Sequence, residues 1–154
     1  GDVVREMIRQ VVSEQLCFAI YNAQKEFSRM YTAALEPYHL TYTQYLALLV
    51  LWENDQRSIT EIGEALSLDS GTLTPMIKRM EQNGFVTRAR SQTDERKVVV
   101  SLTSKAKESK EAILSKVTSC LAVVTEDEEN YFDLLNQINQ LAKKVGGISN
   151  EKSL

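Results

Sequence analysis

The sequence predicts a mainly α-helical protein with one small β-hairpin, arranged as a winged helix-turn-helix between helical segments from both termini. Three observations predict this fold class. Apolar residues recur at helical spacing over most of the 154 residues. Two short helical patterns within 58–84 are joined by a tight turn, which is typical of a helix-turn-helix. Two β-rich runs, about 85–90 and 97–102, flank the polar loop 91–96 and predict an antiparallel hairpin, the wing.

The first part of the chain predicts two helices. Helical periodicity runs from about Val4 to Leu35, where Pro37 closes it, so we expect one long first helix. The segment 41–54 opens on Thr41, a favourable helix cap, and is apolar nearly all round. It therefore predicts a buried helix at the centre of the core.

The helix-turn-helix has local signals at its boundaries. Ser58, followed three residues later by Glu61, forms a capping box that starts a short helix. Asp69 follows a tight turn and caps a second helix, which Asn83 and Gly84 end. The second helix carries one apolar side, made of Leu73, Ile77 and Met80.

Two more helices are expected after the hairpin. Thr103 caps a helix that runs to about Val124. The acidic stretch 126–130 then opens a last helix to about Val145, with its anions at the positive end of the helix. The tail 146–154 is expected to be frayed.

Charge is distributed unevenly along the chain. The formal net charge is −3, yet residues 70–97 carry six cationic and three anionic side chains. A locally basic segment on an acidic body predicts that this face approaches phosphate groups.

The second helix of the motif contains residues that a merely structural helix avoids. Gly71 weakens a helix by about 1 kcal/mol, and an interior proline such as Pro75 by roughly 3 kcal/mol. Local rules tend to fail at functional sites, so we expect this helix to contact double-stranded DNA, with Gly71 allowing close approach of a phosphate group. The other expected contacts are the hydroxyl groups of Ser70, Thr72 and Thr74 and the charges of Lys78 and Arg79.

The wing supplies a second group of cations. Arg96 can enter the narrow, electronegative minor groove, and Asp94 two positions earlier can hold its guanidinium group. Arg88, Arg90 and Lys97 are expected to meet the flanking phosphate groups.

Other classes of function find little support. No stretch reaches the roughly 18 continuous apolar residues of a membrane span, and the N-terminus lacks the apolar run of a signal peptide. We therefore expect a cytoplasmic protein without a membrane partner, whose Cys17 and Cys120 are thiols. With only His39 beside these two cysteines, we predict no metal site, and no cofactor or enzyme motif is found.

The motifs resemble a known family. The stretch LDSGTLTPMIKRMEQNGFVTRARSQTDERKVVVSLT resembles the winged-helix segment of the MarR family of transcriptional repressors. The stretches QLCFAIYNAQKEF and LTYTQYLALLVLWE resemble the OhrR-type branch of that family. The resemblance implies a homodimeric repressor, not an enzyme, that releases a pseudo-palindromic operator when an organic hydroperoxide oxidises Cys17. It also implies three regions: an N-terminal dimerisation helix with the sensing cysteine (1–40), the winged helix-turn-helix (41–102) and C-terminal dimerisation helices (103–154).

Helical geometry limits which tyrosines can serve Cys17. At about 100° per residue, Tyr21 and Tyr31 lie some 40° to either side of Cys17. Tyr31 lies roughly 21 Å further along the helix, so if it serves the thiol it comes from another chain. The resemblance places Tyr31 and Tyr42 at the partner's sensing cysteine, where their hydroxyl groups would favour the reactive thiolate.

Cys120 has two interpretations. It lies on an apolar stripe with Ile113, Val117 and Val124, so it could be a core residue. One branch of the resembled family carries a second cysteine in this region, and that cysteine forms an intersubunit disulfide with the oxidised sensing thiol. Both interpretations stay open.

Two alternative functions also stay open. One is a MarR-type repressor released by a non-covalent small ligand, which would still respond after Cys17→Ser. The other, which we rank lower, is a thiol peroxidase, which would consume many equivalents of peroxide.

Overall fold

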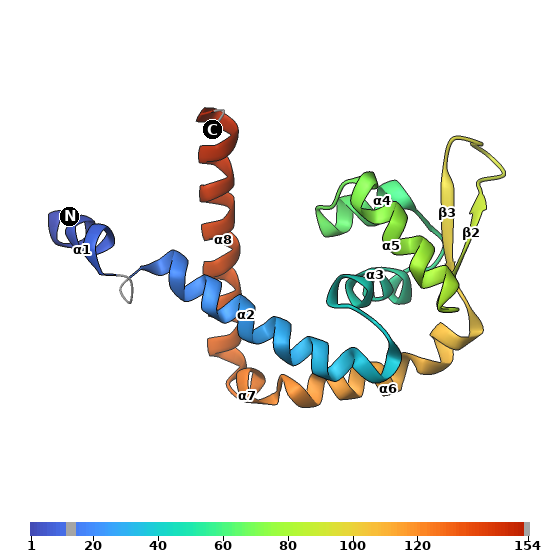
Figure 1. Ribbon diagram of the computed structural model, residues 1–154, viewed down its shortest axis with the longest axis horizontal. Helices are drawn as coiled ribbons and strands as arrows, with labels where there is room; N and C mark the ends of the chain where they lie inside the picture. Colours follow the sequence, from blue (N-terminus) through green and yellow to red (C-terminus); the bar gives the residue numbers. More distant parts are fainter. Residues whose placement is uncertain (12–14, 153–154) are drawn as a thin grey trace. The chain divides into compact units, whose positions relative to one another are not determined.

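The computed structural model describes residues 1–11 and 15–152 and confirms the predicted fold class (Figure 1). The chain forms two compact units, Gly1–Val117 and Thr118–Leu154. The first contains helices and a three-stranded antiparallel sheet, and the second is helical. The division into an N-terminal dimerisation helix, a DNA-binding region and C-terminal dimerisation helices, with boundaries after residues 40 and 102, stays a prediction.

The prediction of one continuous first helix is wrong. Helix α1 (Asp2–Gln10) ends where Val11 adopts an extended conformation, with φ −115° and ψ 107°. Helix α2 (Leu16–Leu35) begins after Gln15, which is also extended, while residues 12–14 of the predicted helix lie outside the described residues. Apolar periodicity continues across the break, but Val11 is β-branched and tolerates the extended conformation well. The predicted end at Leu35 is confirmed, and Pro37 lies in a short 3₁₀ helix, η2 (Glu36–Tyr38), which follows α2 and was not predicted.

The buried central helix is confirmed as α3 (Tyr42–Glu53). Thr41 caps it, because its hydroxyl accepts a hydrogen bond from the Gln44 amide while the Gln44 side chain accepts one from the Thr41 amide. Leu48 and Leu51 are completely buried, which places α3 in the core of the first unit.

Helices α4 (Ile59–Leu66) and α5 (Ser70–Gln82) form the predicted helix-turn-helix. The capping box of Ser58 and Glu61 and the Asp69 cap are both present. The turn between the helices is very tight at Gly63, where an added Cβ would lie 2.6 Å from the backbone oxygen of Leu68.

The predicted wing is β2 (Val86–Arg90) and β3 (Val98–Leu102), which pair antiparallel with Arg88 opposite Val100. A strand that we did not expect, β1 (Arg57–Ser58), pairs with the other edge of β3. Two residues are too few to show alternation in a sequence.

The C-terminal helices differ from their predicted bounds. Thr103 caps α6 (Ser104–Cys120) through a 3.2 Å hydrogen bond from the Ala106 amide, but α6 ends at Cys120 rather than near Val124. A short helix α7 (Ala122–Thr125) follows, and α8 (Glu128–Lys152) continues past the predicted end at Val145. Neither α8 nor any other described helix has the length and apolar character needed to cross a membrane.

Candidate functional site

The outer face of α5 is exposed and carries most of the residues that the sequence singles out. Its apolar side, Leu73, Ile77 and Met80, is buried against the core. The opposite side leaves Ser70, Gly71, Thr72, Lys78 and Arg79 exposed, with Thr74 half-buried. The helix therefore presents small polar groups at its N-terminal end and two cations further along.

The first turn of α5 is organised by Asp69. The Thr72 hydroxyl donates to Asp69 Oδ1 at 2.6 Å and the Thr72 amide donates to Oδ2 at 3.3 Å, so hydrogen bonds from Thr72 hold the pKa of Asp69 below its ordinary value. An added Cβ at Gly71 would lie 2.9 Å from Asp69 Oδ2. Gly71 thus makes room for the capping carboxylate, which is a structural reason for glycine that the sequence pattern did not reveal.

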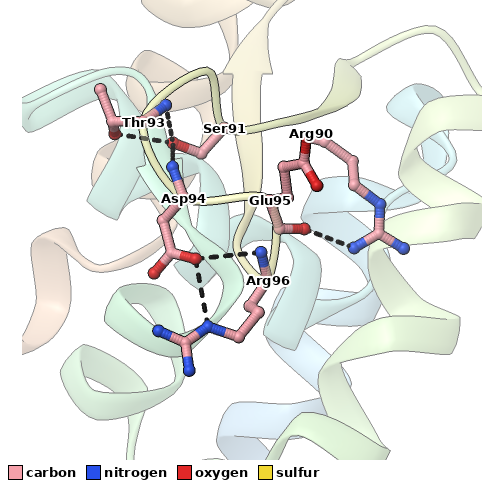
Figure 2. A network of polar contacts seen from close by, with 6 residues as sticks. All are labelled: Arg90, Ser91, Thr93, Asp94, Glu95 and Arg96. Carbon is pink, nitrogen blue, oxygen red and sulfur yellow. Dashed lines mark hydrogen bonds and ion pairs between the residues drawn. The ribbon is translucent and has the colours of Figure 1, made fainter.

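The wing tip holds Arg96 in a defined position (Figure 2). Asp94 Oδ1 accepts hydrogen bonds from the Arg96 amide at 3.1 Å and from Arg96 Nε at 3.3 Å, as the spacing of the two residues predicts. The Arg96 side chain is 92% exposed. Arg90, also exposed, donates from Nη1 to the Glu95 carbonyl oxygen at 2.8 Å, and Lys97 is exposed just before β3.

Arg88 differs from the other wing cations because it is bound to α5. Its Nε and Nη2 donate to Glu81 Oε1 at 3.2 and 3.0 Å, and its amide donates to Glu81 Oε2 at 3.1 Å. The Arg88 side chain and amide hold the pKa of Glu81 below its ordinary value. Sequence reasoning missed this partner, since an acidic residue near the end of a helix gives no signal of a contact with the following strand.

The C-terminal end of α5 is attached to the start of α6. The Thr103 hydroxyl donates to the Gly84 carbonyl oxygen at 2.6 Å, and Lys105 Nζ donates to that of Asn83 at 2.7 Å. Lys105 Nζ also lies 4.6 Å from the centre of the Phe85 ring. These contacts connect the exposed helix to the helix that leads into the second unit.

Cys17 is an exposed thiol in the first turn of α2. Tyr21, one turn later, is exposed and stacks on Phe18 with ring centres 6.4 Å apart. Lys25 Nζ lies 5.8 Å from the centre of the Tyr21 ring. The thiol therefore lies on a surface that also carries aromatic side chains.

Tyr31 lies near the other end of α2 and belongs to a tyrosine cluster with α3. Its ring centre is 4.3 Å from that of Tyr42 and 5.9 Å from that of Tyr45. Tyr45 is buried, and this burial raises the pKa of its hydroxyl. Because α2 is continuous over Leu16–Leu35, Tyr31 stays about 21 Å along the axis from the Cys17 of its own chain.

Cys120 lies at the point where the apolar stripe of α6 becomes accessible. Ile113 and Val117 are buried, Cys120 is half-buried, and Val124 is exposed. Cys120 is also the last residue of α6. Among the residues that the structure describes, no three His, Cys, Asp or Glu side chains come together as metal ligands.

Comparison with known proteins identifies the family. The profile of the SarA/Rot transcriptional regulators matches residues 29–113. The chain is 34% identical to the HTH-type transcriptional regulator SarZ of Staphylococcus aureus, over 92% of this chain and 95% of SarZ. It is 52% identical to the organic hydroperoxide resistance transcriptional regulator of Bacillus subtilis, over 60% of this chain and 63% of that protein, which is less than two thirds of the relative's length.

Solved structures agree with this assignment. AbfR is a protein of Staphylococcus epidermidis. The structure of reduced AbfR bound to DNA superposes on this chain with a TM-score of 0.80 at 36% identity, over 91% of this chain and 96% of AbfR. The disulfide form of AbfR superposes with a TM-score of 0.68 at 40% identity, over 87% of this chain and 97% of AbfR. The relatives from Bacillus subtilis and Staphylococcus aureus are both transcriptional regulators, the class of protein predicted for this chain. The chain belongs to the MarR/SarA family of transcriptional regulators, with an OhrR-type relative among its matches.

Proposed function

We propose that this regulator is a homodimeric repressor that binds a pseudo-palindromic DNA operator and releases it when an organic hydroperoxide oxidises Cys17. The oxidised thiol then forms an intersubunit disulfide with Cys120. One observation carries the proposal: AbfR, similar over nearly its whole length, has both a reduced DNA-bound form and a disulfide form. Both cysteines of this chain are free thiols and at least partly accessible.

The DNA contacts come from α5 and the wing. In a two-fold dimer the two copies of α5 enter successive major grooves, and the wings reach the flanking minor grooves. The exposed face of α5 provides hydroxyl groups and the cations Lys78 and Arg79, while Arg96 projects from the wing tip. Arg90 and Lys97 contact phosphate groups, whereas Arg88 acts mainly through Glu81, by joining the wing to α5.

The dimer is formed by the terminal helices. Large apolar side chains of α2 and α8 are exposed in the single chain, and a second copy would cover them. Examples are Leu16, Phe18, Phe132, Leu135 and Ile138. In such a dimer, Tyr31 and Tyr42 of one subunit approach the sensing cysteine of the other, and Tyr21 flanks the thiol within its own helix.

The redox step uses the hydroperoxide as oxidant. The Cys17 thiolate attacks one peroxide oxygen, the O–O bond breaks, and the alkoxide takes a proton and leaves as an alcohol, so sulfur becomes a sulfenic acid. The thiol of Cys120 of the partner subunit then attacks that sulfur, an S–S bond forms, and the hydroxyl group leaves as water. The apolar and aromatic side chains near Cys17 favour organic hydroperoxides over hydrogen peroxide.

The oxidised state must change the position of α5 to release DNA. Shifting operator occupancy from mostly bound to mostly free requires about 5 kcal/mol of differential affinity. Cys120 ends α6, and the start of α6 is tied to the end of α5 by Thr103 and Lys105. A disulfide that displaces α6 therefore acts on α5 through these two residues.

The proposal is tested on a duplex that the reduced protein selects from a random-sequence library. Binding is measured before and after one equivalent of cumene hydroperoxide, for wild type, Cys17→Ser and Cys120→Ser, with non-reducing gels in parallel. We expect wild type to release the duplex and form a covalent dimer, and Cys17→Ser to stay bound.

Each other outcome removes one part of the proposal. Selection of no duplex by the reduced protein contradicts DNA binding, and release of Cys17→Ser by peroxide contradicts the sensing role of Cys17. A Cys120→Ser variant that still forms the covalent dimer contradicts the Cys17–Cys120 disulfide. If peroxide leaves wild type bound while a small ligand releases it, the regulator responds to non-covalent binding instead.

A further inference from the structure

We infer that Ser91 is a positioning residue of the wing: its hydroxyl group orders the tip so that Asp94 presents Arg96 to DNA. The inference rests on the proposed DNA-binding function and adds a residue that the sequence pattern did not single out. Ser91 is the first residue after β2 and is half-buried, and Figure 2 shows its side chain joined by hydrogen bonds to Thr93 and Asp94.

The Ser91 hydroxyl oxygen is the centre of the tip network. It accepts hydrogen bonds from the amides of Thr93 and Asp94, both at 3.3 Å. It also lies 3.1 Å from the Thr93 hydroxyl oxygen, with which it shares a hydrogen bond. One side chain thus fixes the backbone at the two residues that precede the turn to Arg96.

The fixed backbone directs the Asp94 carboxylate. Asp94 Oδ1 accepts from both the amide and Nε of Arg96, so the direction of the guanidinium group depends on where the Asp94 backbone lies. The loop is closed behind it, because the Ser91 amide donates to the Lys97 carbonyl oxygen at 2.9 Å and the Lys97 amide donates to that of Asp94 at 3.0 Å. Ser91 therefore contacts both ends of the loop: its hydroxyl group binds the amides of Thr93 and Asp94, and its own amide binds Lys97.

Order at the tip matters because Arg96 is almost fully exposed, at 92%. A long side chain that is free in solution loses conformational entropy when DNA immobilises it. The hydrogen bonds to Asp94 restrict Arg96 before binding, so part of this loss occurs on folding. Without the Ser91 hydroxyl, the amides of Thr93 and Asp94 lose their acceptor and the tip samples other conformations.

The experiment measures affinity for the selected duplex with wild type, Ser91→Ala and Ser91→Thr, each alone and with Arg96→Ala. We expect Ser91→Ala to weaken binding by about five- to tenfold, the effect of roughly one lost hydrogen bond. Ser91→Thr keeps the hydroxyl and stays within about twofold of wild type. Combined with Arg96→Ala, Ser91→Ala causes no additional loss, because it acts through Arg96. Gln92→Ala, an exposed neighbour in the same loop, is the matched control and leaves affinity unchanged.

A second readout does not depend on DNA. In amide NMR spectra of the free dimer, Ser91→Ala shifts and broadens the signals of Thr93 and Asp94 while those of α5 stay in place. Any one of three results for Ser91→Ala overturns the inference. The NMR signals of Thr93 and Asp94 stay unchanged, the affinity for the duplex stays unchanged, or the affinity falls by the same factor whether position 96 is arginine or alanine. In these cases wild type still binds the duplex and the proposed function stands, whereas a wild type that selects no duplex refutes the proposed function itself.

Discussion

Replacement of Gly63 by alanine is expected to destabilise the helix-turn-helix, although alanine is the better helix former. The new Cβ would lie 2.6 Å from the Leu68 backbone oxygen and 3.0 Å from Cδ1 of Leu73, a residue that is fully buried. Overpacking of this kind lowers the free energy of unfolding by about 1–3 kcal/mol. Movement of the turn would also weaken the 2.9 Å hydrogen bond from the Leu68 amide to Gly63, worth about 1 kcal/mol.

The gain in helix propensity offsets part of this cost. Glycine to alanine inside a helix contributes about 1 kcal/mol, so the net destabilisation is about 2 kcal/mol. For a chain of this size that corresponds to a fall in Tm of roughly 4–8 °C. Thermal and urea denaturation followed by circular dichroism at one fixed protein concentration measure it.

Gly146 provides the matched control, since it lies within α8 and an added Cβ there would meet nothing within 4 Å in the chain. Gly146→Ala should stabilise the protein, by up to about 1 kcal/mol. If Gly63→Ala is as stable as Gly146→Ala, the close approach at the turn does not constrain the fold and the reasoning is refuted.

Three further predictions concern DNA binding, pH and assembly. Arg96→Ala should weaken binding of the selected duplex by about 10- to 100-fold without changing oxidation of Cys17, and equal affinity would show that the tip does not reach DNA. Because Arg88 lowers the pKa of Glu81 from its ordinary 4.5, the pair stabilises the folded state above that pH and loses this effect as pH falls through the lowered pKa. Glu81→Gln should therefore be less stable than wild type in urea at neutral pH, with a difference that vanishes in acid, and a pH-independent difference would contradict the ion pair. Ile138→Glu places a charge on the exposed apolar face of α8 and should yield monomers in sedimentation velocity, and an unchanged dimer would exclude this face from the interface.

Local signals in the sequence predicted the boundaries of the helix-turn-helix. The caps at Thr41, Ser58 and Asp69 each act on an amide three residues ahead, so the sequence spacing alone specifies the contact. The Asp94–Arg96 contact spans two residues and was predicted for the same reason. Partners this close in the chain are within reach of each other by spacing alone, so a sequence pattern can indicate the contact.

The break after α1 shows where local signals fail. Apolar residues continue at helical spacing through Val11, yet the backbone there is extended. Periodicity reports which side chains share a face, but it does not report whether the backbone between two helical runs is helical. The end of α6 at Cys120 was missed in the same way, because the apolar stripe continues into α7.

What the sequence determined by itself is the helix-turn-helix with its hairpin, the position of the caps and the residues exposed on α5, since these depend on neighbours within one turn or along one strand. The tertiary structure alone decided that Arg88 pairs with Glu81, that Gly63 meets Leu68, and that the ring of Tyr31 lies beside that of Tyr42. Each of these contacts joins different elements or the two sides of a turn. Their formation depends on how the elements pack, and packing is set by the whole set of buried side chains rather than by any short stretch of sequence.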